Sequence, residues 1–185
     1  RMGGQFFTDQ RVTKLAMTLL HFDPLSGDNL LDPASGTGGF LIAALNKIQL
    51  LAEHKYKNKN IEDKIVAIAK KTLCGIEVDD NVCSIANATL AARLGDVEHE
   101  LVVNADTIRQ FAEGFAKIDF PTCGFDCIAT NPPFGTKITI KDNKLLSKYE
   151  LAKVISDTEL PLNAAKTTPR APDILFLELC VRMLK

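Results

Sequence analysis

Apolar residues along the chain follow two patterns, the spacing of amphipathic helices and short continuous runs. Near the amino end, an apolar stripe at i, i+3, i+4, i+7 and i+8 predicts a helix that faces the core, with Thr8 as its N-cap. The stripe consists of Val12, Leu15, Ala16, Leu19 and Leu20. Further helices are predicted over residues 40–51 and 61–71, and from residues 79–80 to a stop at Gly95.

The later helices also carry burial predictions. In the helix that ends before Gly95, one face is expected to hold Val82, Ile85, Ala86, Thr89 and Leu90. The last helix, residues 173–185, is apolar nearly all round, which is typical of a buried helix.

Four short apolar runs alternate with the helices and predict strands over residues 29–32, 73–78, 100–103 and 125–130. Strands that alternate with helices favour an α/β fold, in which a parallel sheet is built through right-handed crossovers. No linker or repeat divides the chain, so residues 1–185 are expected to form one domain.

Composition agrees with a globular protein that has no membrane span. The 185 residues are 46% hydrophobic and 24% charged, and no apolar run approaches the roughly 20 residues of a spanning helix. We therefore expect a cytoplasmic protein. The net charge of −1 gives no overall positive field for a phosphate backbone.

The cysteines and histidines do not suggest a metal site. The five cysteines include no CxxC pair, and the three histidines are scattered singly, so no metal is expected. Cys123 and Cys127, with three residues between them, are not favoured as a metal-binding pair for the same reason.

The predicted strand ends carry the candidate chemistry, because ligands of open α/β sheets bind outside the carboxyl ends of the strands. Residues 32–40 read DPASGTGGF, with three glycines where the backbone turns into a helix. This loop matches neither a P-loop nor the G-x-G-x-x-G fingerprint. Glu77 ends the second strand, where a carboxylate can accept hydrogen bonds from both hydroxyls of a ribose. Asp106 follows the third strand and can accept a hydrogen bond from an exocyclic amine. Each signal alone is more often structural, but their coincidence favours a nucleoside site.

The sharpest feature is the tetrad Asn131-Pro132-Pro133-Phe134 after the fourth strand. Two prolines fix the backbone and remove two N–H donors, which leaves carbonyls to accept hydrogen bonds. The Asn131 side chain adds another acceptor, and Phe134 adds a flat apolar face. The group fits a planar base with an exocyclic amine better than a purely structural Pro-Pro turn.

Residues 32–40 together with this tetrad resemble the S-adenosyl-L-methionine-dependent N6-adenine DNA methyltransferases. The tetrad alone is also met in some RNA guanine-N2 methyltransferases. The run from Gly4 to Thr8 resembles the segment before the glycine loop in modification (M) subunits of type I restriction-modification systems, and the similarity extends over most of the chain. It implies a Rossmann-like class I methyltransferase fold with a largely parallel sheet flanked by helices, truncated here after the fourth strand and its helix.

The resemblance also implies roles for individual residues. The methionine side of the cofactor would be lined by Gln5, Phe6, Phe7 and Thr8. Its amino-acid and sulfonium region would be surrounded by Asp32, Ser35, Gly36, Thr37, Gly38 and Gly39. Glu77 would hold the ribose and Asp106 the cofactor adenine. Asn131 and the Pro132 carbonyl would orient the amine of a flipped-out adenine, while Phe134 stacks on the base and Pro133 shapes the wall.

The resemblance further implies double-stranded DNA as substrate, and a specificity subunit and a restriction subunit as partners. Asp9 stands where the family usually has proline, which is expected to shift the start of the first helix. The lysines of residues 137–153 face either DNA, a neighbouring subunit or solvent. Two alternatives stay open: methylation of RNA guanine or protein glutamine, and a non-catalytic module kept for assembly.

Overall fold

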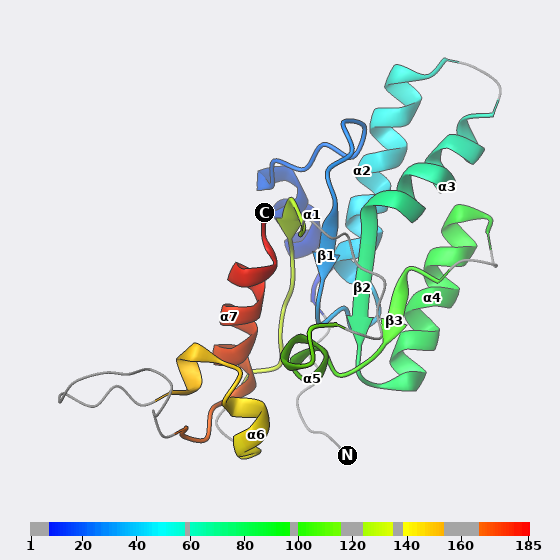
Figure 1. Ribbon diagram of the computed structural model, residues 1–185. Coiled ribbons are helices and arrows are strands. Elements are labelled where there is room, and N and C mark those ends of the chain that lie inside the picture. Colours follow the sequence, from blue (N-terminus) through cyan, green and yellow to red (C-terminus); the bar gives the residue numbers. More distant parts are fainter. Residues whose placement is uncertain (1–7, 58–59, 97–99, 116–123, 135–138, 154–166) are drawn as a thin grey trace.

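A computed structural model of the chain describes residues 8–57, 60–96, 100–115, 124–134, 139–153 and 167–185 (Figure 1). Its centre is a parallel four-stranded sheet in the order β3-β2-β1-β4. The strands are β1 (Leu30–Asp32), β2 (Leu73–Glu77), β3 (Val102–Asn104) and β4 (Cys127–Ile128). The α/β prediction and all four predicted strands are confirmed, each within a few residues.

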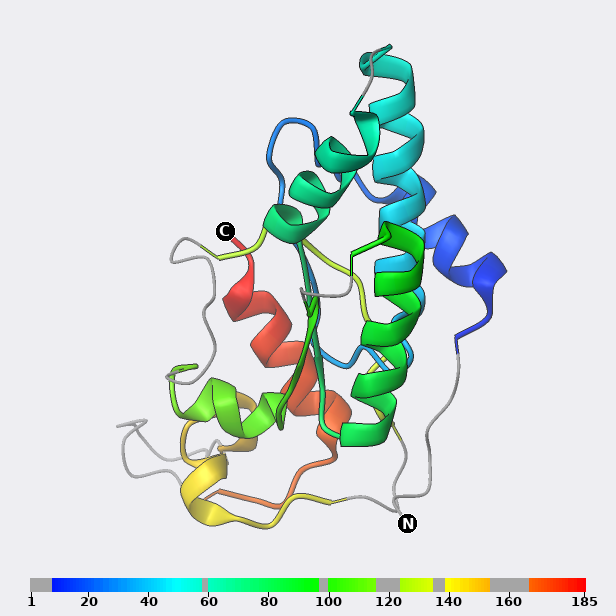
Figure 2. The same ribbon diagram turned by 90° about the vertical axis from the view of Figure 1, so that its right-hand side faces the viewer.

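Helices cover both faces of this sheet, which Figure 2 shows nearly edge-on. One face packs against α1 (Gln10–Leu19), α2 (Gly39–Lys55), α3 (Ile61–Thr72) and α4 (Asp80–Leu94). The other packs against α5 (Thr107–Ala112), α6 (Asn143–Leu146), the 3₁₀ helix η1 (Glu150–Ala152) and α7 (Pro172–Met183). Leu30 belongs to the first core and Leu31 to the second, as expected where successive side chains of a strand point to opposite faces.

Residues 139–153, between β4 and α7, pack against the second core. Antiparallel bridges join Ile140 to Arg170 and Lys153 to Thr167. The buried carboxylate of Glu178 on α7 accepts hydrogen bonds from the Glu150 and Leu151 N–H groups, at 2.9 and 2.8 Å. These contacts fix the described residues beyond the Asn131 tetrad relative to the sheet.

The predicted inner face of α1 is confirmed only for Ala16 and Leu20, which pack against the first core, and is wrong for the other three residues. Thr13 and Met17 are buried, whereas Val12, Leu15 and Leu19 are more than half exposed. The reason is the surface that α2 offers: Gly39 has no side chain, so the small Thr13 packs against it. The amino group of Lys47 on α2 also donates to the carbonyls of Met17 and Leu20 at the end of α1, at 3.3 and 3.2 Å.

Two further burial predictions need correction. In α4 the buried residues are Cys83, Ala86 and Leu90, while Ile85 is half exposed. On this side of the helix the Asn87 amide donates to the Val102 carbonyl in β3 and accepts from its N–H. The all-round burial predicted for the last helix is also wrong, since α7 leaves one apolar side exposed. That side consists of Ile174, Leu177 and Val181.

Within the described residues, no helix combines the length and apolar character needed to cross a membrane.

Gly75 in β2 is required by close packing. A Cβ there would lie 2.7 Å from Leu41 Cδ1 and 3.1 Å from Val102 Cγ2, and both neighbours are fully buried. We predict that Gly75→Ala lowers the free energy of unfolding by about 1–3 kcal/mol, as overpacking does. Gly39→Ala is the matched control, because its Cβ meets only Thr13 at an ordinary 3.5 Å. Urea unfolding of both variants checks this, and equal stabilities would contradict it.

Candidate functional site

The glycine-rich loop between β1 and α2 is held by hydrogen bonds to β2. The Ser35 N–H and hydroxyl both donate to the carbonyl of Ile76, at 2.9 and 3.2 Å. Gly36 and Gly38 have φ values of +53° and +83°, in the left-handed region that residues other than glycine rarely adopt. Gly38 then becomes the N-cap of α2 without any side-chain cap, so the first N–H groups of the helix face the loop.

Glu77 joins this loop to the start of α4. Its side chain is 7% exposed, and Oε2 accepts from the Gly36 N–H at 2.9 Å. Oε1 accepts from the Asp79 N–H, also at 2.9 Å, and Asp79 in turn caps α4. The residue expected to hold a ribose therefore also supports the backbone of the site, with lone pairs left on both oxygens.

Asp32 ends β1 at the mouth of the loop and is almost completely buried. Its Oδ1 accepts from the Ala34 N–H at 3.3 Å, while Oδ2 has no hydrogen-bond partner among the described residues. Burial raises the pKa of this carboxyl to about 7, even though the nearby Thr130 side chain and the Ala34 N–H lower it, and the negative charge of Glu77 adds to the rise. A buried carboxyl with a free oxygen is suited to a cationic partner.

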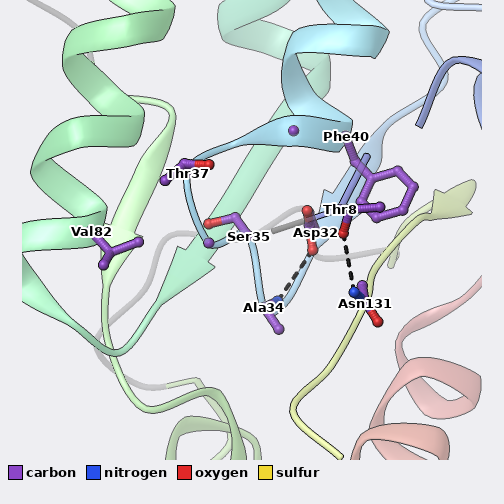
Figure 3. A pocket seen from close by; sticks show the side chains of 10 residues that line it. Thr8, Asp32, Ala34, Ser35, Thr37, Phe40, Val82 and Asn131 are labelled. Carbon is purple, nitrogen blue, oxygen red and sulfur yellow. Dashed lines mark hydrogen bonds between the residues drawn. The ribbon is translucent and has the colours of Figure 1, made fainter. Parts of the chain in front are cut away.

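Asn131 reaches the same place from the neighbouring strand. Because β4 pairs with β1, the Ala129 N–H donates to the Leu31 carbonyl at 3.0 Å, and the chain then runs on past the end of β1. The Asn131 side-chain Nδ2 donates to the Thr8 hydroxyl at 3.1 Å (Figure 3). Phe134, three residues later, is half exposed.

Asp32, Asn131 and the glycine-rich loop border a small, open pocket with a cavity volume of about 50 Å³ (Figure 3). It is lined by Thr8, Asp32, Ala34, Ser35, Gly36, Thr37, Gly39, Phe40, Val82 and Asn131. Seven of the predicted site residues thus meet at one pocket. Ala34, Phe40 and Val82 were not predicted, although Ala34 and Phe40 stand within the quoted loop motif.

Asp106 lies apart from the lining residues. It is the N-cap of α5, where its carboxylate accepts from the Arg109 N–H at 3.2 Å and pairs with the Arg109 side chain at 3.4 Å. The next residue, Thr107, donates its hydroxyl to the Pro33 carbonyl at 2.6 Å. α5 therefore supports the glycine-rich loop from a second side.

Other predicted residues need separate mention. Thr8 was expected to cap α1, but the cap is Asp9, whose carboxylate accepts from the Arg11 N–H at 2.8 Å. The Thr8 hydroxyl instead accepts a hydrogen bond from the Asn131 side chain. Gln5, Phe6 and Phe7 lie outside the described residues, as do Cys123 and Lys137.

Two cysteines outside the pocket lining, Cys74 and Cys180, are partly buried. Burial raises the pKa of Cys74 to about 12 and of Cys180 to about 11, which keeps both thiols protonated. Across the part of the chain that the structure describes, no three His, Cys, Asp or Glu side chains gather as metal ligands.

Two curated relatives show what the chain resembles. It is 28% identical over 138 residues to a type I restriction enzyme EcoEI methylase subunit of Escherichia coli, which covers 71% of this chain and 24% of that protein. It is 30% identical over 131 residues to the type II restriction enzyme and methyltransferase RM.BcgI of Heyndrickxia coagulans, covering 71% of this chain and 18% of that protein. The chain thus spans a quarter or less of either relative.

Solved structures give the same fold. A modification subunit of a type I restriction enzyme from Vibrio vulnificus superposes over 100% of this chain and 31% of its own, with a TM-score of 0.65 and 23% identity. The EcoKI M protein superposes over 97% of this chain and 32% of its own, with a TM-score of 0.61 and 20% identity. The Rossmann-like methyltransferase fold is therefore confirmed. Since the sequence model of N-6 DNA methylases matches residues 1–167, the chain belongs to the N-6 DNA methylase family.

Proposed function

We propose that this chain is the cofactor-binding and catalytic part of an N6-adenine DNA methyltransferase, the modification subunit of a type I restriction-modification system. The observation that carries the proposal is the meeting of Asp32 and Asn131 at one pocket, beside the glycine-rich loop. Family membership and the resemblance to methylase subunits support it.

The pocket residues fit S-adenosyl-L-methionine, which supplies a methyl group already activated on a sulfonium. The unpartnered Oδ2 of Asp32 suits the cationic amino group of the methionine part. The N–H groups at the start of α2 suit its carboxylate, because a helix N-terminus favours anions. Ser35, Gly36, Thr37 and Gly39 line the space between these two points.

The nucleoside half of the cofactor is assigned to two other strand ends. We place the ribose at Glu77, whose oxygens each accept only one backbone N–H and keep a lone pair. We place the cofactor adenine at Asp106, whose side chain is 44% exposed and so is accessible to an amine.

The target amine is assigned to the tetrad. Asn131 Oδ1 and the Pro132 carbonyl would accept the two amine hydrogens and hold the nitrogen in line with the methyl group. Phe134 would stack on a flipped-out adenine, with Pro133 forming the wall beside it. Phe134 is half exposed, which agrees with a role at the surface of the site.

The wider assembly follows from the same proposal. Residues 1–185 would be part of a larger catalytic domain, acting in the cytoplasm on double-stranded DNA with a specificity subunit and a restriction subunit. The near-neutral charge of −1 fits a division of labour in which partners supply much of the phosphate contact.

We predict that Asn131→Ala, made in the natural full-length protein, lowers methyl transfer to DNA adenine by about 100-fold or more. The amine would lose an acceptor, while the cofactor contacts at Asp32 and Glu77 stay in place. Mass spectrometry of N6-methyladenine measures the transfer, and calorimetry with S-adenosylhomocysteine measures cofactor binding. Asn46→Ala, at an exposed position on α2, is the matched control.

The outcomes of that experiment separate the candidate functions. A wild-type protein that methylates RNA guanine or protein glutamine but not DNA adenine would show that the substrate is not DNA adenine. Cofactor binding without any transfer would favour a non-catalytic assembly module. Loss of cofactor binding in folded Asn131→Ala would contradict the separation of the two half-sites.

We also predict a pH dependence of cofactor affinity that originates at Asp32. Its pKa of about 7 means that the free pocket holds a proton below pH 7, which must leave before the carboxylate can pair with a cation. Affinity for S-adenosylhomocysteine should therefore fall about tenfold per pH unit below pH 7 and level off above it. In Asp32→Asn the affinity should be weaker and flat from pH 6 to 8. Asp63→Asn, an exposed change on α3, should keep the wild-type profile.

A further inference from the structure

Thr8 and Asn131 are 123 residues apart in sequence, yet their side chains meet at the pocket (Figure 3). Asn131 Nδ2 donates to Thr8 Oγ1 at 3.1 Å, and both residues line the pocket. The contact joins the segment before α1 to the segment after β4. Because these segments belong to different elements, each is held in place independently of the other.

The position of Thr8 is well determined by the start of α1. Asp9 caps the helix through the Arg11 N–H, so the Thr8 hydroxyl is not used as the cap. Thr13 packs against Gly39, and Lys47 bonds the last carbonyls of α1. The helix is thus attached to α2 at Thr13 and at its C-terminal end, and Thr8 directly precedes this attached helix.

In the observed contact the nitrogen end of the Asn131 amide is engaged by Thr8. A side-chain amide carries a donor and an acceptor on one terminal carbon, and rotation about its last bond exchanges them. When Nδ2 is engaged by Thr8, Oδ1 is the atom left to accept a hydrogen bond from another group. An amide turned the other way would present a donor, which would repel an amine instead of holding it.

Resting on the proposed function, we infer that Thr8 is a positioning residue for methyl transfer, which holds the Asn131 amide with Oδ1 toward the target amine. The resemblance already places Thr8 near the methionine side of the cofactor. The hydroxyl can do both, because it accepts from Asn131 with a lone pair and would donate its own proton to the methionine part of the cofactor, which would leave it only an acceptor toward the amide. The two roles predict different kinetic effects.

The test compares Thr8→Val with Thr8→Ser in the natural full-length protein. Valine keeps the shape of threonine and removes the hydroxyl, whereas serine keeps the hydroxyl. At saturating S-adenosylmethionine and saturating DNA, kcat of Thr8→Val should fall about 10- to 100-fold, as expected for a misplaced reacting group. The kcat of Thr8→Ser should stay within about threefold of the wild-type value, because serine keeps the hydroxyl.

The matched control is Thr18→Val on the same helix. Thr18 is exposed and its hydroxyl bonds only the Lys14 carbonyl of its own helix, at 2.9 Å, so kcat should be unchanged. A Thr8→Val enzyme that has normal kcat at saturating cofactor, with only weaker cofactor binding, would overturn the positioning role. Equal losses in Thr8→Ser and Thr8→Val would overturn it as well.

A second measurement does not depend on DNA methylation at all. With ¹⁵N-labelled asparagine, the Asn131 side-chain NH₂ signal, identified by its absence in Asn131→Asp, should shift in Thr8→Val and stay near its wild-type position in Thr8→Ser. An unshifted signal in Thr8→Val would show that the contact is not formed, and would overturn the inference. If the wild type does not methylate adenine, the proposed function fails, and this signal still decides whether Thr8 orients Asn131.

Discussion

Glu77 makes the contact on which the site depends. Its buried carboxylate accepts one N–H from the glycine-rich loop and another from the start of α4, each at 2.9 Å. Two loops that follow different strands are thereby held by a single side chain at the edge of the sheet. Burying that charge is costly unless it is hydrogen-bonded, so the two backbone donors and the position of Glu77 depend on each other. Its negative charge also helps to keep Asp32 protonated near neutral pH.

The strand order explains why residues far apart in sequence reach one pocket. β1 lies between β2 and β4, so the residues that follow these strands emerge side by side at the carboxyl edge. Asp32 ends β1, and Asn131 follows β4. The glycine-rich loop is hydrogen-bonded to β2 through the Ile76 carbonyl. α1 is not part of the sheet, but its attachment to α2 brings Thr8 to the same edge. The proposed methyl transfer needs a cofactor and an amine to approach each other, and this arrangement provides adjacent places for them.

The sequence predicted the strands and the strand-end residues well, because each is announced by local chemistry: an apolar run, followed by an acid, a glycine turn or a proline pair. It failed where burial depends on a partner element. The stripe of α1 has helical spacing, yet Thr13 is buried and Leu15 is exposed. Gly39 on α2 has no side chain, so Thr13 packs against it. The same limit applies to the N-cap, since Thr8 and Asp9 are both good caps. Only the position of Asn131, set by β4 pairing with β1, shows that the Thr8 hydroxyl is engaged elsewhere.

The central claim is that the residues around Asp32, the glycine-rich loop and Glu77 form a working cofactor pocket. Calorimetric titration of the folded chain with S-adenosylhomocysteine tests this most directly, with Glu77→Gln as the comparison because glutamine keeps the size but loses one acceptor and the charge. We expect one molecule bound per wild-type chain, and binding at least about tenfold weaker in the variant, because a charged hydrogen bond is lost. A wild-type chain that is folded by circular dichroism and binds nothing would contradict the account.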